Sequence, residues 1–213
     1  MKIIFLGAPG SGKGTQSGIL AKTLGIPAVS TGDIIRNILK TDDSRASVLK
    51  SYIDKGELVP SSIVEELLKE RLEHSDCSKG YILDGFPRTI EQAEALEKMG
   101  VFVDIVIDIS VPDDLICIRM LNRLTCTKCG AIYNSETEMR PKISGICDLC
   151  GGSLKKRSDD NEETIRTRLK VYNDQTLPLR NFYKSKNILH SIDGSADLKT
   201  SSEEILKLVR SSC

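Results

Sequence analysis

The chain has 213 residues, which is long enough to bury a sizeable core and fits a single α/β domain that carries insertions. Its 30 basic and 30 acidic residues balance, so no overall charge favours nucleic acid or an anionic membrane as a partner. The sequence contains no apolar run of the roughly 18 residues that a membrane helix needs, and its N-terminal apolar run is too short for a signal peptide. We therefore expect a soluble, cytoplasmic protein in which any positively charged site is local.

Apolar runs alternate with stretches of helical spacing along most of the chain. The expected strands cover residues 2–6, 27–30, 81–83, 103–109 and 188–192. This alternation predicts an α/β fold, a parallel sheet of five strands with helices on both faces. Helix ends are expected at Gly25 and Gly100. Helix starts are predicted where Ser, Thr or Asp precedes Glu or Gln by three positions, at Ser62, Thr89, Asp160 and Ser201.

Two segments do not follow the alternation of strands and helices. Residues 31–59 have helical character throughout, and residues 122–160 are rich in Gly, Cys and polar side chains. We expect inserted subdomains at 30–59 and 122–160, so that the core consists of residues 1–29, 60–121 and 161–213.

A glycine-rich loop follows the first expected strand and precedes a helix-forming stretch. It matches the pattern G-x-x-x-x-G-K completely, from Gly7 to Lys13. The backbone N–H groups of such a loop, the positive end of the helix dipole and the lysine ammonium all favour a polyphosphate. The loop is a variant, because Gly14 stands where a Ser or Thr usually reaches Mg²⁺ and Thr15 follows one residue later. The alternative is a glycine-rich turn without a ligand, which the flanking strand and helix disfavour.

Two C-x-x-C pairs lie in the second insertion. Cys126 and Cys129 are followed, after seventeen residues, by Cys147 and Cys150, and this spacing is typical of structural zinc sites. Four thiolates leave no open position on the metal. Metal binding supplies ~10 kcal/mol or more to a segment that is too poor in apolar residues to fold alone. Zinc is the expected metal, although four thiolates also accept iron, and two separate redox dithiols are the alternative.

The charge of the cysteine segment disfavours nucleic acid as its ligand. Residues 122–160 hold seven Lys and Arg against five Asp and Glu, and a dication with four thiolates contributes about −2. A nearly neutral segment matches a phosphate backbone poorly, so we expect a lid over a small ligand. Of the other cysteines, Cys77 and Cys117 are expected to be packing residues and Cys213 to belong to the tail.

Basic side chains occur where the fold would direct them at phosphates. The strand at 81–83 leads into Asp84 and Arg88, at the sheet edge where open α/β folds bind ligands, and Asp84 could hold Mg²⁺ through water. Six arginines from separate segments are expected to converge when the insertions close: Arg36, Arg88, Arg119, Arg123, Arg157 and Arg168. The other arginines considered are expected to be solvated charges or minor ion pairs: Arg45, Arg71, Arg140, Arg166, Arg180 and Arg210.

Several motifs in this order span nearly the whole chain: GAPGSGKGT, STGDIIR, GYILDGFPRT followed by EQAEAL, RSDD and ETIRTRL. Together they resemble the adenylate kinases, in the long form whose lid carries a four-cysteine metal site. The resemblance implies a P-loop NTPase type of core, a helical AMP-binding insertion at 30–59 and a zinc-ribbon-like lid at 122–160. It implies reversible, Mg²⁺-dependent phosphoryl transfer from ATP to AMP by a monomer, with structural Zn²⁺ and without nucleic acid or membrane partners.

The resemblance also implies the residues of the site. The ATP side comprises Gly10, Ser11, Gly12, Lys13, Gly14, Thr15, Arg119, Arg123, Ile132 and Tyr133. The AMP side comprises Thr31, Arg36, Leu58, Val59, Gly85, Arg88, Gln92, Arg157 and Arg168. The catalytic residues implied are Lys13, Arg88, Arg123, Arg157 and Arg168. Gly14 followed by Thr15 is the family's own form of the loop, whereas Asn122 and Leu124 stand where members often have Gly and a second Arg.

The expected reaction fits the scarcity of histidine in the chain. A monophosphate acceptor is already anionic, because its second pKa is about 6, so the transfer needs no general base. His74 and His190 lie outside every motif. Gln92 could cap the helix at Thr89 or read the adenine of AMP, and an amide also meets a pyrimidine edge. A UMP/CMP kinase is therefore the nearest alternative, and a zinc-containing nucleotide-binding regulatory module is the alternative from another class.

Overall fold

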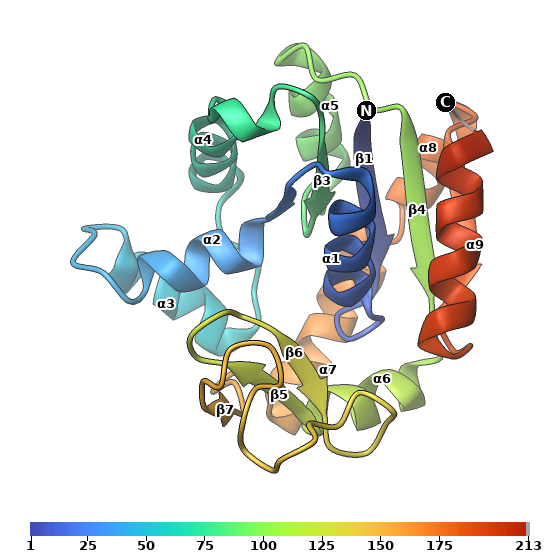
Figure 1. Cartoon of the computed structure of the whole chain (residues 1–213). Coiled ribbons are helices and arrows are strands. Elements are labelled where there is room, and N and C mark those ends of the chain that lie inside the picture. Colours follow the sequence, from blue (N-terminus) through green and yellow to red (C-terminus); the bar gives the residue numbers. More distant parts are fainter. Residues whose placement is uncertain (212–213) are drawn as a thin grey trace.

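The computed structural model describes residues 1–211, and a parallel sheet forms its centre (Figure 1). Within these residues, five strands pair in parallel in the order β2-β3-β1-β4-β8. Their bounds are Lys2–Gly7 (β1), Ala28–Ser30 (β2), Tyr81–Asp84 (β3), Ile105–Ser110 (β4) and Leu189–Asp193 (β8). The predicted α/β fold and its five strands are confirmed. The strand ends differ from the prediction by one or two residues, because apolar character alone does not mark where backbone pairing stops.

Helices cover both faces of the sheet, and alternate residues of each strand point to different faces. On one face, α1 (Lys13–Leu24) and α9 (Leu198–Ser211) pack Leu20 and Ile205 against Ile3. On the other face, α5 (Ile90–Lys98) and α8 (Leu179–Ser185) enclose Ile4, and α4 (Ser61–Leu72) packs alongside α5. Figure 1 shows α1 and α9 in front of the sheet and α5 and α8 behind it.

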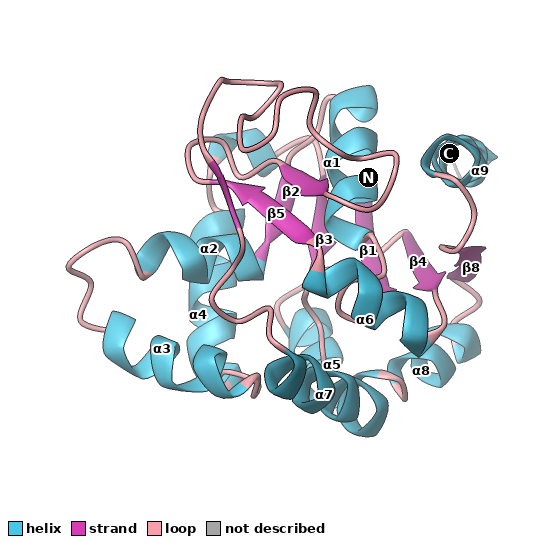
Figure 2. Ribbon diagram, turned by 90° about the horizontal axis from the view of Figure 1, so that it is seen from below, coloured by secondary structure: helices cyan, strands magenta, loops and turns pink. Residues whose placement is uncertain are grey.

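The two insertions lie next to the carboxyl ends of the strands. The first contains α2 (Thr31–Ile38) and α3 (Ala46–Lys55), with residues 31–59 all described and free of strands, as predicted. The second follows α6 (Asp113–Leu121) and forms a small antiparallel sheet of β5 (Arg123–Cys126), β6 (Ile132–Asn134) and β7 (Leu154–Lys155) in the order β6-β5-β7. Figure 2, drawn from below, shows this small sheet in front of the ends of β1 and β3. The chain then returns through α7 (Glu162–Val171) and a π-helical turn, Tyr172–Thr176.

Only one of the four predicted helix starts is confirmed. The Thr89 hydroxyl caps α5 by accepting from the backbone N–H of Gln92 at 3.3 Å. The prediction at Ser62 is wrong, because α4 begins one residue earlier, after Pro60. The predictions at Asp160 and Ser201 are also wrong: Asn161 caps α7, and Asp197 accepts from the third residue of α9. The predicted ends at Gly25 and Gly100 are confirmed, and both glycines have positive φ, 66° and 73°.

The described cysteines outside the two C-x-x-C pairs agree with the expectation for them. Cys77 is buried in a short 3₁₀ helix, Ser75–Cys77, and Cys117 is half-buried against the cluster of α6 and α7, so both are packing residues. Cys213 lies outside the described residues. Among the helices of residues 1–211, none combines the length and the apolar character needed to cross a membrane.

Candidate active site

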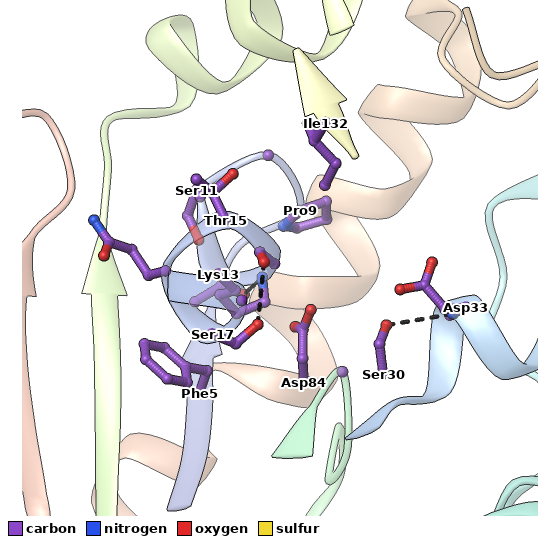
Figure 3. A pocket seen from close by; sticks show the side chains of 18 of the residues that line it. Phe5, Pro9, Ser11, Lys13, Thr15, Ser17, Ser30, Asp33, Asp84 and Ile132 are labelled. Carbon is purple, nitrogen blue, oxygen red and sulfur yellow. Dashed lines mark hydrogen bonds between the residues drawn. The ribbon is translucent and has the colours of Figure 1, made fainter. Parts of the chain in front are cut away.

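The loop after β1 wraps around the ammonium group of Lys13 (Figure 3). The Nζ atom donates hydrogen bonds to the carbonyl oxygens of Gly7 and Ala8, both at 2.7 Å. Gly12 precedes α1 with a φ of 101°, a conformation that glycine adopts without strain. Among the described residues, no side chain caps the start of α1, so its first N–H groups are available to an anion. The loop, the helix start and the lysine therefore present donors to one point.

Lys13 and Asp84 carry opposite charges at the edge of the sheet, and each shifts the pKa of the other. Burial lowers the pKa of Lys13 to about 8, and the negative charge of Asp84 opposes this shift. Burial likewise raises the pKa of Asp84, and Lys13 opposes that shift. A Cβ at Gly14 would lie 3.3 Å from Asp84 Oδ2 and 3.4 Å from Ile132 Cδ1. Glycine at this position thus allows the carboxylate and the second insertion to approach the loop, as Figure 3 shows.

The six arginines that were expected to converge all line one cavity of about 790 Å³. Burial, together with the positive charges of Arg123 and Arg36, lowers the pKa of Arg157 to about 9. Burial also lowers the pKa of Arg88, with a contribution from the charge of Arg168. Each cation therefore disfavours the charged form of its neighbours, and an anionic ligand in the cavity would relieve this repulsion.

Two buried aspartates hold two of these arginines. Arg123 donates from Nε and Nη2 to the two carboxylate oxygens of Asp160, at 2.8 and 2.5 Å. Arg168 pairs with Asp159, and its Nη1 lies 3.8 Å from Asp160. Burial would raise the pKa of Asp159, but the charge and the hydrogen bond of Arg168, together with the charges of Arg157 and Arg123, outweigh burial and hold this pKa below its usual value. Sequence reasoning included both aspartates in the RSDD motif, but it gave Asp159 no role and expected Asp160 to start a helix.

The residues that the resemblance implies for AMP line the same cavity. The hydroxyl of the buried Thr31 donates to the Gly85 carbonyl at 2.9 Å, and Arg88 Nε donates to the same oxygen at 2.8 Å. Arg36 pairs with Asp33 at 2.6 Å. The cavity wall includes all the residues predicted for nucleotide binding and for Mg²⁺: Gly10 to Thr15, Thr31, Arg36, Leu58, Val59, Asp84, Gly85, Arg88, Gln92, Arg119, Arg123, Ile132, Tyr133, Arg157 and Arg168.

Tyr133 lines the cavity, but its hydroxyl faces the cysteines. The Oη atom accepts from the Asp148 N–H at 2.8 Å and lies 3.5 Å from the Sγ atom of Cys147. Tyr133 therefore supports the turn that carries the second cysteine pair. Its hydroxyl is committed to that contact and is directed away from the arginines.

The four cysteines of the second insertion form a compact cluster. All four Sγ atoms lie within 4.8 Å of one another, with Cys126 to Cys150 at 3.5 Å and Cys129 to Cys147 at 3.6 Å. Thiolates at about 2.3 Å from a tetrahedral zinc ion would be about 3.8 Å apart, so the donor set fits a four-coordinate metal. Leu124, one of the two departures from the family pattern, packs against this cluster. Asn122, the other, ends α6 and donates to the Ile118 carbonyl at 3.0 Å.

The expectation for Arg180 is wrong. Its Nε atom lies 2.7 Å from the carboxylate of Asp108, which is only 1% exposed inside the sheet. Arg166 points to solvent whereas Arg168, two residues later, points into the cavity. Arg140 and Arg210 are exposed, and Arg45 and Arg71 form local ion pairs with Asp43 and Asp76, as predicted.

A contact from the π-helical turn was not predicted. The Thr176 hydroxyl donates to the backbone carbonyl of Arg88 at 2.9 Å, across 88 residues of sequence. Thr176 lies in no recognised motif, so only the three-dimensional packing reveals this support for Arg88. Turns of π-helix occur frequently at functional sites.

Comparison with known proteins adds to this geometry. The family model "Adenylate kinase" matches residues 5–188. The adenylate kinase of Caldicellulosiruptor saccharolyticus is 48% identical over 211 residues, which cover 97% of this chain and 98% of the relative. The adenylate kinases of Lachnospira eligens and Archaeoglobus fulgidus are each 46% identical, covering 98% and 96% of this chain and 100% and 96% of the relatives. A phosphate loop, a cavity lined by six arginines and a match over nearly the full length agree, and the chain therefore belongs to the adenylate kinase family.

Proposed function

We propose that this cavity carries out the reaction of an adenylate kinase, the reversible, Mg²⁺-dependent transfer of the terminal phosphoryl group of ATP to AMP to give two ADP. The observation that supports this most strongly is the meeting of Lys13 and six arginines from separate segments in one cavity. Such a set of cations suits two nucleotides that bring several phosphate groups together. Alignment of the two nucleotides and charge stabilisation of the moving group are what phosphoryl transfer requires.

On the ATP side, the donors of residues 10–15 surround the β- and γ-phosphates. Lys13 supplies the charge nearest to these groups, and Arg119 and Arg123 approach from α6 and β5. Mg²⁺ that arrives with ATP neutralises phosphate charge, and Asp84 is the residue that would hold it through water. Ile132 covers the loop from the side of the second insertion, where Figure 3 places it.

On the AMP side, Arg36 and Arg88 bind the acceptor phosphate, and Leu58 and Val59 form the apolar wall beside the base. Thr31 and Gly85 shape the same wall through their shared hydrogen bond. Gln92 lies at the end of this half of the cavity and reads the base. The acceptor phosphate is an anion near neutral pH, so no side chain of the site has to remove a proton.

Arg157 and Arg168 contact the group in transfer, together with Lys13, Arg88 and Arg123. Their positive charges stabilise the negative charge that spreads over the equatorial oxygens of the moving phosphoryl group. Arg168 is held by Asp159, and Arg157 Nε donates to Thr125 at 3.0 Å. Removal of one such preorganised contact should cost roughly 10²–10³ in rate.

We assign residues 122–160 to a lid, residues 30–59 to an AMP-binding insertion and residues 1–29, 60–121 and 161–213 to the core. Contacts across these boundaries support closure over the substrates. Glu138 of the lid accepts from the Leu198 N–H at 2.8 Å, and Thr164 at the start of α7 donates to the Asp54 carbonyl at 3.4 Å. Closure excludes water, which competes with AMP as an acceptor.

We assign a structural role to zinc, with Cys126, Cys129, Cys147 and Cys150 as its ligands. The donor set supports this role, because four thiolates complete a tetrahedral site and leave no position for substrate. The fold of the lid depends on the same site, because Cys126 and Cys147 belong to its small buried core and Cys150 packs against that core.

We further propose that the protein acts as a cytoplasmic monomer on free nucleotides, without nucleic acid or membrane partners. Its equal numbers of basic and acidic residues support this. The cavity supports a monomer, because each of the residues assigned above comes from one polypeptide.

The test is the formation of ADP from ATP with AMP, UMP or CMP as acceptor. We expect AMP to be the preferred acceptor. A preference for UMP or CMP would make the protein a UMP/CMP kinase. Negligible turnover with all three acceptors would leave the nucleotide-binding regulatory module as the better description.

A further inference from the structure

The side-chain amide of Gln92 is held at both ends where it lines the AMP side of the cavity. Gln92 is only 3% exposed. Its Oε1 atom accepts from the backbone N–H of Arg88 at 2.8 Å, and its Nε2 atom donates to the hydroxyl of Ser61 at 3.0 Å. Ser61 is the first residue of α4, and no motif of the sequence includes it. The amide is therefore oriented by two segments of the chain before a nucleotide enters.

The orientation of this amide follows from the chemistry of its partners. A backbone N–H can only donate, so the atom of Gln92 that faces Arg88 must be the oxygen. Rotation of the amide by half a turn would place its NH₂ group against this N–H and leave two buried donors without acceptors. At the other end, Ser61 accepts one proton of the NH₂ group. One lone pair of Oε1 and one N–H of Nε2 remain for a ligand.

A base that matches these two remaining positions must carry a ring nitrogen acceptor next to an amino donor. Adenine offers N1 beside its 6-amino group, and cytosine offers N3 beside its 4-amino group. Hypoxanthine, guanine and uracil present the reverse, a ring N–H beside a carbonyl oxygen. Against a fixed amide, the reversed edge sets donor against donor and acceptor against acceptor, which is costly in a buried site.

We infer that Ser61, acting with the backbone N–H of Arg88, is a specificity-determining residue, because it fixes the Gln92 amide for an acceptor base with an amino group next to a ring acceptor. This inference rests on the proposed function, which assigns this half of the cavity to the acceptor nucleotide. Among the described residues, the Ser61 hydroxyl bonds to the Gln92 amide, so the effect of Ser61 is on the choice of base. The selection follows the hydrogen-bonding edge and is separate from ring size, which the walls around Leu58 and Val59 restrict.

Two pairs of monophosphates isolate the edge from the ring size. AMP and IMP share the purine ring and differ at position 6, and CMP and UMP share the pyrimidine ring and differ at position 4. The experiment measures kcat/KM for these four acceptors at saturating MgATP. The enzymes compared are the wild type, Ser61→Ala, Ser61→Thr and Ser62→Ala, the last being a matched control because Ser62 is the exposed neighbour.

We expect the wild type to prefer AMP to IMP and CMP to UMP. Ser61→Ala is expected to reduce both ratios roughly three- to tenfold, because it removes about one net hydrogen bond. The change should appear in KM for the acceptor, with kcat little changed. Ser61→Thr keeps the hydroxyl and should restore both ratios towards those of the wild type. Ser62→Ala should leave both ratios unchanged.

Three results would overturn the inference. The first is that the AMP-to-IMP and CMP-to-UMP ratios of kcat/KM are the same in Ser61→Ala as in Ser62→Ala. The second, which needs no variant and holds even if Ser61→Ala fails to fold, is a wild type that uses IMP as well as AMP or UMP as well as CMP. The third is a wild type that phosphorylates none of the four, which would overturn the proposed function together with this inference. The first two leave AMP turnover intact and so count against the role of Ser61 alone.

Discussion

Replacement of Asp160 by Asn tests how the arginines at the boundary between the lid and the core are held, because Asp160 contacts Arg123 of the lid and lies 3.8 Å from Arg168 of the core. The Asp160 side chain has no exposed surface and binds Arg123 through two hydrogen bonds, at 2.8 and 2.5 Å. Asparagine keeps the shape of the side chain and one acceptor oxygen. It loses the charge and places an NH₂ group against a guanidinium donor. The positive charge of the nearly buried Arg123 is then only partly compensated.

The expected size of the effect follows from this burial. Removal of one partner from a buried ion pair costs ~3–5 kcal/mol. Arg123 is 14% exposed, and it and Asp160 lie at the two ends of the proposed lid, beside Arg168 of the core, so a rearrangement of this boundary would return Arg123 to water and limit the cost. We therefore expect the loss to appear in lid closure and not in global unfolding. A decrease of about 10- to 100-fold in kcat/KM for ATP corresponds to ~1.4–2.8 kcal/mol of this cost.

Initial rates at varied ATP and saturating AMP give this number, and a thermal melt of the same samples reports on the fold. Asp174→Asn is the matched control, because Asp174 is an exposed aspartate in the nearby π-helical turn. The reasoning is refuted if Asp160→Asn and Asp174→Asn have the same kcat/KM. It is also refuted if Asp160→Asn lowers the melting temperature of the whole protein by about 10 °C or more while kcat/KM is retained, because the ion pair would then serve the fold.

Lys13→Met should abolish turnover without changing the circular dichroism spectrum, and residual activity above a few per cent would contradict the role of its charge. Because burial lowers the pKa of Lys13 to about 8, the free enzyme loses this ammonium as pH rises through that value. Titrations should therefore show that ATP binding weakens above about pH 8 in the wild type and not in Lys13→Met. Removal of the lid metal by a chelator should melt the lid before the core in calorimetry, and a single unchanged transition after verified metal loss would exclude this. Thr176→Val removes the hydrogen bond to the Arg88 carbonyl and should raise KM for AMP about three- to tenfold while KM for ATP stays constant, whereas Thr176→Ser should remain near the wild type.

The features predicted correctly from the sequence are local in the chain. The phosphate loop needs a strand, three glycines and Lys13 within a few residues, and the metal site needs two short C-x-x-C turns. The buried strands are near-continuous apolar runs, which follow from burial on both faces of a parallel sheet. In each case, residues that are neighbours in sequence are also neighbours in space, so the pattern alone carries the information.

Two of the predictions that were wrong, those for Asp160 and Arg180, involved a choice between a local and a distant partner. Asp160 has the sequence of a helix cap, but the guanidinium of Arg123, distant in the chain, provides two charge-assisted hydrogen bonds, and Asn161 takes the cap. Arg180 was predicted to be a surface residue because no acidic residue near it in the sequence indicates a partner. Its partner, Asp108, lies on β4, far away in the sequence from Arg180 on α8, and is buried in the sheet.

The sequence by itself determined the type of fold, the phosphate loop, the cysteine cluster and the set of arginines from which the site is built. Only the tertiary structure decided which residues hold those parts in place. Asp160 holds Arg123, Thr176 holds the backbone of Arg88, and Ser61 holds the amide of Gln92, each through hydrogen bonds. The physical reason is that a supporting hydrogen bond requires only a donor and an acceptor at the correct distance. Many residues along the chain can meet that requirement, and packing alone selects which of them does.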